Sequence, residues 1–288
     1  MRWKKARRSD NLVDARGTGG GIGGKGLGIG GIVLIVVIGL LSGQDPLQIL
    51  GQIGGQLIEQ QATPTQNRAP SAEQSEQVEF VRAILGDTED TWQALFAASG
   101  SQYQEPRLIL FEGGVKSACG FASSAVGPFY CPGDQQVYLD LQFFREMEQR
   151  FAAAGDFAQA YVIAHEIGHH VQTLLGVSAK VNQARRSGQR VEGDGGLLVR
   201  QELQADCLAG LWAHHAQKRH AWLEPGDLEE ALNAAAAIGD DRLQKQSRGQ
   251  VVPDAFTHGT SEQRVRWFRA GFESGDIARC DTFKAARL

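Results

Sequence analysis

Cysteine is scarce in this sequence, and the few cysteines lie far apart. The 288 residues include four, Cys119, Cys131, Cys207 and Cys280, and no C-x-x-C pair. A structural zinc site built from thiolates is therefore not expected. The sequence also lacks the G-x-S-x-G element of serine hydrolases and a phosphate-binding loop, because the glycine-rich run at 19–24 leads into an apolar segment. These absences argue against serine-nucleophile and nucleotide chemistry.

A large excess of positive charge is also missing. The net charge at pH 7 is −4, although the first 25 residues contain seven Lys or Arg and only two Asp. A basic N-terminal segment followed by an acidic remainder argues against binding of nucleic acid and favours orientation at a membrane.

Residues 26–43 carry no charge and reach the lower length limit for a bilayer span. We interpret them as a transmembrane anchor between a basic cytoplasmic tail (1–25) and a polar linker (44–71), with the functional domain at 72–288. The segment lacks a clear A-x-A cleavage site, and Gln44 stands where a lipoprotein would need cysteine. A cleaved signal peptide and a buried core helix remain the alternatives.

The stretch 161–170 contains the pattern H-E-x-x-H as His165-Glu166-Ile-Gly-His169. Apolar residues on both sides predict a helix that ends near Gly176. Residues i and i+4 of a helix share a face, so the two imidazoles can bind one metal ion. Zinc suits two imidazoles and one carboxylate with a fourth position for water, and Glu166 can act on that water as a general base.

The third ligand is expected on a second helix. The longer pattern H-E-x-x-H-x-x-G-x-x-H would need glycine at 172 and histidine at 175, but the sequence has Gln172 and Leu175. Glu202 and Asp206 again lie four residues apart. We predict that Glu202 is the third ligand and that Asp206 accepts the N–H of a ligating histidine, His165. The alternative is a solvated acidic pair on a surface helix.

Three blocks of the sequence together resemble the bacterial family of predicted neutral zinc metallopeptidases. They are His165-Glu-Ile-Gly-His-His170, Glu202-Leu-Gln-Ala-Asp206-Cys207 and Thr257-His258-Gly-Thr-Ser-Glu262-Gln-Arg264. The basic N-terminus, the apolar segment and Phe129-Tyr-Cys131 match as well, so the resemblance covers nearly the whole chain. It implies an α+β, mainly helical zincin-like domain with a small antiparallel sheet, one Zn²⁺ ion and a peptide or protein substrate. The basic N-terminus before the apolar segment predicts a single-pass protein of the bacterial inner membrane, with its catalytic domain periplasmic or extracellular.

His258 precedes the last expected helix. A metallopeptidase needs a donor to the tetrahedral oxyanion besides the metal, and thermolysin-like enzymes use a histidine from this general part of the chain. His258 and Arg264 are the candidate donors, and a purely structural loop histidine is the alternative.

The cysteines suggest two disulfides. Cys119 and Cys131 flank one loop and form the natural local pair, which leaves Cys207 and Cys280. An oxidising compartment would permit both, whereas free buried thiols would suit a cytosolic protein.

Short strands are predicted at 107–111 and 136–141, and either could provide the sheet edge on which an extended peptide binds. We expect a membrane-anchored zinc endopeptidase. A hypothesis from another class is a zinc-stabilised, membrane-anchored binding or assembly factor without turnover. Glu166 favours the enzyme, because a structural metal site has no use for a general base.

Overall fold

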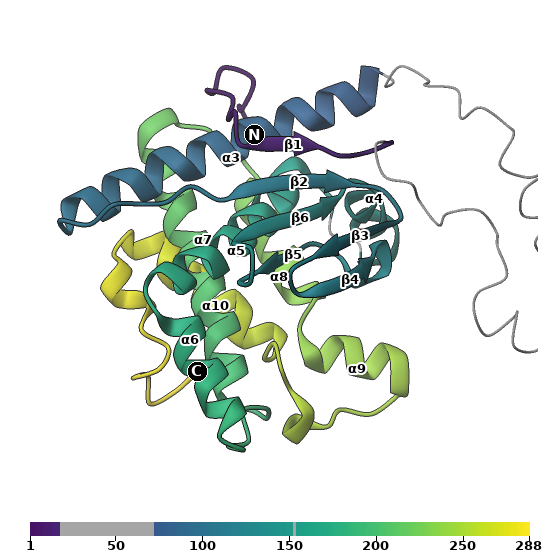
Figure 1. Ribbon diagram of the computed structural model, residues 1–288, viewed down its shortest axis with the longest axis vertical. Helices are drawn as coiled ribbons and strands as arrows, with labels where there is room; N and C mark the ends of the chain where they lie inside the picture. The colour runs from purple at the N-terminus through teal and green to yellow at the C-terminus, as the bar shows by residue number, and fades with distance from the viewer. Residues whose placement is uncertain (18–71, 152–153) are drawn as a thin grey trace, which may run out of the picture. The chain divides into compact units, whose positions relative to one another are not determined.

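The structure is a computed structural model that describes residues 1–17, 72–151 and 154–288. Residues 1–16 and 72–288 belong to one compact unit (Figure 1). The predicted anchor at 26–43 and the predicted linker at 44–71 lie outside the described residues. Among the residues that are described, none of the helices combines the length and the apolar character that a membrane crossing needs.

A four-stranded sheet forms one layer of this unit (Figure 1). Its strands, in spatial order, are β1 (Leu12–Asp14), β2 (Arg107–Phe111), β6 (Gln136–Asp140) and β5 (Phe129–Cys131). β1 and β6 both pair with β2 in parallel, whereas β5 pairs with β6 in the antiparallel sense. The expected antiparallel sheet is therefore wrong, and the sheet is mixed. The reason is that the chain leaves β2, forms a separate hairpin of β3 (Gly114–Ser117) and β4 (Gly120–Ser123), and returns along β5 before it enters β6.

Alternation of side chains fixes which face of the sheet is buried. Leu108 and Leu110 of β2 lie opposite Val137 and Leu139 of β6, and all four side chains are at most 1% exposed. Successive residues of a strand point to opposite faces, so these four share the face toward the helices. Each such side chain stabilises the fold by about 1.5–3 kcal/mol on burial.

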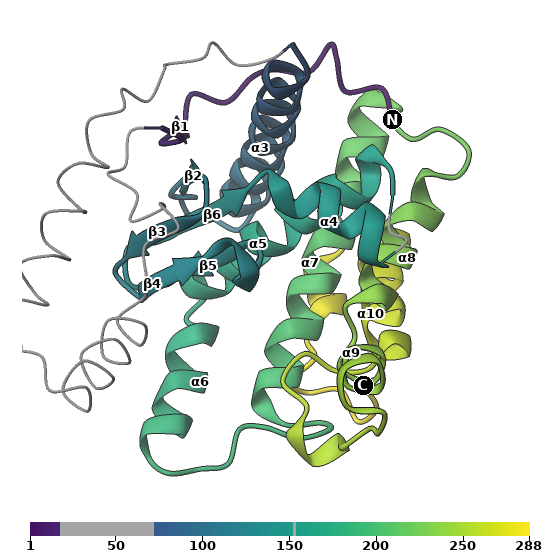
Figure 2. The same ribbon diagram turned by 90° about the vertical axis from the view of Figure 1, so that its right-hand side faces the viewer.

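Helices form the second layer. The longest are α3 (Ala72–Ala98), α5 (Asp156–Leu174), α7 (Leu197–His220) and α10 (Ser261–Ser274). α5 passes beneath the sheet, in contact with β5 and β6, and α7 and α10 lie side by side (Figures 1 and 2). The shorter helices are α4 (Gln142–Phe151), α6 (Val177–Arg186), α8 (Asp227–Ala237) and α9 (Asp240–Arg248).

α7 and α10 cross at very short range because each has a glycine at the contact. A Cβ atom on Gly210 would lie 1.9 Å from the Phe268 carbonyl oxygen, and one on Gly271 would lie 1.9 Å from the Cys207 carbonyl oxygen. No larger residue fits at either position without separating the helices. This close crossing brings α10 near the part of α7 that carries Glu202 and Asp206.

The N-terminal residues are part of the same unit, which corrects the expected basic tail. β1 extends the sheet, Trp3 is only 7% exposed, and its ring packs edge-on against Phe80 of α3 at 5.3 Å. The guanidinium group of Arg7 lies 2.7 Å from Glu89 and 2.9 Å from Asp90, also on α3. The sequence pattern does not reveal this packing, because the two buried apolar residues, Trp3 and Leu12, are isolated among charged residues and show no period.

The cysteines form the two predicted disulfides, Cys119–Cys131 and Cys207–Cys280. The first connects the turn of the β3–β4 hairpin to β5. The second connects α7 to the short 3-10 turn Ile277–Cys280 near the C-terminus.

Candidate metal centre

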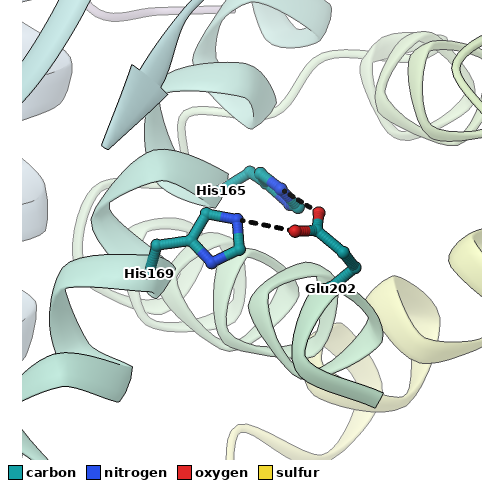
Figure 3. A group of neighbouring side chains, drawn as sticks. All are labelled: His165, His169 and Glu202. Atoms are coloured by element: carbon teal, nitrogen blue, oxygen red, sulfur yellow. Dashed lines mark ion pairs between the residues drawn. The ribbon is translucent and has the colours of Figure 1, made fainter. Parts of the chain in front are cut away.

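α5 presents His165 and His169 to α7. The two imidazole rings lie one helical turn apart, with centroids 4.7 Å from each other. Most of α5 is buried, because it is enclosed by the sheet, by α7 and by α8. The histidines therefore point into the protein, and their Nε2 atoms face the same carboxylate (Figure 3).

That carboxylate belongs to Glu202, in the second turn of α7. One of its oxygens lies 3.3 Å from His165 Nε2, and the other lies 3.4 Å from His169 Nε2. Two ligand atoms about 2.05 Å from a zinc ion at the tetrahedral angle would lie about 3.3 Å apart. Charge-assisted hydrogen bonds are shorter, about 2.7–2.9 Å. The spacing and the donor types therefore fit a tetrahedral zinc site with one position left over.

A glycine inside the motif allows this meeting of helices. A Cβ atom on Gly168 would lie 3.0 Å from the carbonyl oxygen and 3.2 Å from the Cα of Ala205 on α7. Such contacts are tighter than ordinary packing, so any side chain at 168 would push α7, and Glu202 with it, away from the histidines.

Asp206 fixes the first histidine and is itself held by an arginine. Its Oδ1 accepts from His165 Nδ1 at 2.9 Å and from the Tyr161 hydroxyl at 2.6 Å. The Arg264 guanidinium group of α10 donates to both carboxylate oxygens, each at 2.9 Å. Burial opposes ionisation of Asp206, but Arg264 and His165 lower its pKa to about 2. A carboxylate in this position keeps Nδ1 of His165 protonated and leaves Nε2 for a metal.

His258 stands beside the centre, held by an aspartate that the sequence analysis missed. Asp240 Oδ2 accepts the backbone N–H groups of residues 257, 258 and 259 at 2.7, 2.6 and 3.1 Å. Its Oδ1 lies 3.2 Å from His258 Nδ1. Burial opposes protonation of His258, but Asp240 and Glu202 raise its pKa above the ordinary value. Asp240 lies 18 residues before His258, so no local spacing could have linked the two.

A cavity of about 550 Å³ connects these groups. Its wall includes the three candidate ligands, Glu166, His258 and Arg264, together with the edge strand residues Phe129 and Tyr130. Glu166 is 8% exposed and follows His165 directly on α5. The structure thus brings His165, Glu166, His169, Glu202 and His258 to one cavity and places Asp206 behind it.

The remaining histidines face away from this centre. His170 is bonded to the Gln104 carbonyl oxygen at 2.6 Å and to the Tyr130 hydroxyl at 3.2 Å. His214 and His215 bind backbone carbonyl groups of residues 272 and 275, and His220 binds Asp87. Within residues 1–17, 72–151 and 154–288, no metal-binding cluster includes His214 or Cys207, which is in a disulfide.

Comparison with known proteins places the chain in a family. The model of a family described as "putative neutral zinc metallopeptidase" matches residues 1–283. The protein YpfJ of Escherichia coli K12 is 50% identical over 289 residues, which cover 98% of this chain and 99% of YpfJ. Rv2575 of Mycobacterium tuberculosis H37Rv is 45% identical over 219 residues, 73% of each chain. Both relatives bear names that call them uncharacterized, and no solved structure matches the chain. The chain therefore belongs to this zinc metallopeptidase family.

Proposed function

We propose that the chain is a membrane-attached zinc endopeptidase that hydrolyses peptide bonds with Glu166 as its general base. The observation that carries the proposal is the meeting of His165 Nε2, His169 Nε2 and the Glu202 carboxylate at 3.3–3.4 Å, in the wall of the cavity that Glu166 also lines. A structural zinc site has its fourth position closed by a protein ligand. In the described part of the chain only three residues converge here, which supports a catalytic site.

The substrate would bind along β5. The sequence analysis assigned the binding edge to the strand at 107–111 or to the one at 136–141, but both are interior strands of the sheet. β1 and β5 are the two edge strands of this sheet, and of these two only β5 has residues in the cavity wall, Phe129 and Tyr130. An edge strand offers backbone N–H and C=O groups to an extended peptide. A peptide bound there would run past the three candidate ligands.

The chemistry assigns a separate role to each group. A zinc ion at the three ligands would polarise the scissile carbonyl group and make a water molecule more acidic. Glu166 accepts a proton from the attacking water and delivers it to the leaving amine. His258 donates a hydrogen bond from Nε2 to the developing oxyanion, because Thr257 and Asp240 occupy its Nδ1. Arg264 is the weaker candidate donor, since its guanidinium group is engaged by Asp206.

We also propose that residues 26–43 attach the enzyme to the bacterial inner membrane and that the domain works on the periplasmic or extracellular side. The two disulfides support this compartment, because disulfides persist where the surroundings are oxidising.

The test compares full-length variants in detergent. The wild type should bind one zinc per chain, measured by elemental analysis, and should cleave labelled unfolded casein. Glu166→Gln should keep the zinc and lose about 10²–10⁴-fold in rate, the usual contribution of general acid–base catalysis. Glu202→Ala should instead lose zinc, and Glu148→Gln, at an exposed position of α4, should behave like the wild type.

Full cleavage by Glu166→Gln would remove the general-base assignment. A wild type that binds zinc but cleaves no unfolded protein would favour the binding or assembly factor.

A further inference from the structure

The two candidate histidine ligands have different partners on the nitrogen that faces away from the metal position. His165 Nδ1 meets the carboxylate of Asp206, whereas His169 Nδ1 meets an amide, the Oε1 atom of Gln172, at 2.9 Å. Gln172 lies three residues further along α5 and is fully buried. An amide in this position needs the support of further hydrogen bonds, because it can rotate and present either its oxygen or its nitrogen to the histidine.

That support comes from a second buried amide. Gln172 Nε2 donates to the carbonyl oxygen of Gln201 at 2.6 Å and to Oε1 of Gln204 at 3.0 Å. Gln204 Nε2 donates in turn to the carbonyl oxygen of Cys280 at 3.0 Å. Cys280 is 1% exposed and is joined by its disulfide to Cys207, three residues after Gln204 on α7. We call the path His169–Gln172–Gln204–Cys280 the amide relay.

The direction of every bond in the amide relay is determined by its ends. Backbone carbonyl groups can only accept, so Gln204 must turn its NH₂ group toward Cys280 and Gln172 must turn its NH₂ group toward Gln201. The oxygen of Gln172 is then the atom that faces His169. His169 must donate from Nδ1, and the lone pair of Nε2 is left for the metal. No choice of amide orientation or tautomer remains open.

The groups behind the two candidate histidine ligands differ in type, but both sets are electrically neutral. At His165, the negative charge of Asp206 is balanced by Arg264. At His169, both amides are neutral. The groups behind the ligands therefore add no net charge to the site, and the charge of a bound zinc ion is offset by Glu202 alone among the ligands.

We propose that Gln172 and Gln204 are positioning residues that hold His169 in its metal-binding tautomer, and that the Cys207–Cys280 disulfide fixes the far end of the amide relay. This inference rests on the zinc site of the proposed function. Partners behind metal ligands typically contribute about 10–100-fold to metal affinity. The C-terminal disulfide is thus linked to metal retention, although neither cysteine touches a ligand.

The experiment measures how fast zinc leaves the full-length protein into an excess of chelator, and the visible spectrum of the cobalt-substituted protein. Gln204→Met and Gln172→Met should each release zinc about tenfold faster and shift the cobalt bands. Gln217→Met is the matched control. It removes a partly buried hydrogen bond of α7, in which the Gln217 side chain accepts from the backbone N–H of Leu223 at 2.8 Å, but it lies outside the amide relay. Its zinc release should equal that of the wild type.

The variant Gln172→Glu distinguishes an effect on the position of His169 from an effect on the stability of the protein. It loses the same two donated hydrogen bonds as Gln172→Met, so it should be destabilised as well. Its carboxylate still accepts from His169 Nδ1, as Asp206 does at His165, so its zinc release should return to near the wild-type rate. All rates are measured well below the melting temperature of every variant.

The two disulfides provide a second comparison. Cys207→Ser with Cys280→Ser should accelerate zinc release as Gln204→Met does, whereas Cys119→Ser with Cys131→Ser should not. Equal release by Gln204→Met, Gln217→Met and the wild type would overturn the inference while leaving the zinc site intact. A wild type without bound zinc would instead overturn the proposed function.

Discussion

At the scale of single residues, Asp206 satisfies three buried groups at once. His165 Nδ1, the Tyr161 hydroxyl and the Arg264 guanidinium group all donate to this one carboxylate. A buried donor without a partner costs about 1–3 kcal/mol, and more when it is charged. Asp206 therefore contributes both to the stability of the fold and to the orientation of a candidate ligand. A substitution of Asp206 affects both contributions together.

His258 gives a prediction at this scale that separates a catalytic from a structural histidine. His258 Nδ1 lies 2.8 Å from Thr257 Oγ1 and 3.2 Å from Asp240 Oδ1. With Nδ1 donating to these oxygens, Nε2 can donate only when the ring is protonated. Asp240 raises the pKa of His258 against the opposing effect of burial, so the protonated form persists to higher pH and is lost as pH rises through that pKa. His258→Ala should lower kcat about 10²–10³-fold and keep zinc bound.

Asp240→Asn should move the alkaline fall of kcat to lower pH. Asp254→Asn, at an exposed position before the same loop, should leave the pH profile unchanged. An unaltered alkaline limb in Asp240→Asn would show that His258 does not act as the protonated donor.

The candidate ligands could be predicted from sequence because their geometry is local. The i, i+4 spacing places His165 and His169 on one helix face, and the same spacing links Glu202 to Asp206. Gln172 and Gln204 also lie within these helices, but glutamine is common in helices and carries no signal of its own. Asp240 touches His258 only because α9 packs behind the loop, and spacing along the chain does not encode that contact.

At the scale of elements, the strands were predictable and their partners were not. A short apolar run identifies 107–111 as a strand, and alternation identifies 136–141, of which the structure forms Gln136–Asp140. Pairing depends on the path of the chain between them, and the three-residue strands β1 and β5 are too short to show a period. β5, the edge strand along which we propose that the substrate binds, is therefore a strand that periodicity could not detect.

The packing of the N-terminal segment gives a prediction at this scale. Trp3→Ala should lower the free energy of unfolding of the full-length protein by about 3–5 kcal/mol, as for other large buried aromatic residues. Lys5→Ala, two positions later and exposed, should change it by less than about 0.5 kcal/mol. Urea denaturation in detergent, followed by circular dichroism, measures both. If the segment were a free tail, the two variants would be alike.

At the scale of the whole molecule, the free energy of unfolding should depend on pH in the acid range, because Asp206 ionises there. Its pKa of about 2 in the folded protein lies below the ordinary 3.8, so its ionised form stabilises the fold above about pH 4. That contribution, on the order of 2 kcal/mol, is lost as pH falls from about 4 toward 2. In zinc-free protein, the unfolding free energy of the wild type should fall more steeply over this range than that of Asp206→Asn. Parallel curves would contradict the assignment.

The place of residues 1–16 in the sheet also limits how the chain can meet a lipid bilayer. Segments that share a sheet must lie in the same compartment, and residues 1–16 share one with the domain at 72–288. A single crossing, with a cytoplasmic head and an external body, would require β1 to be withdrawn from β2.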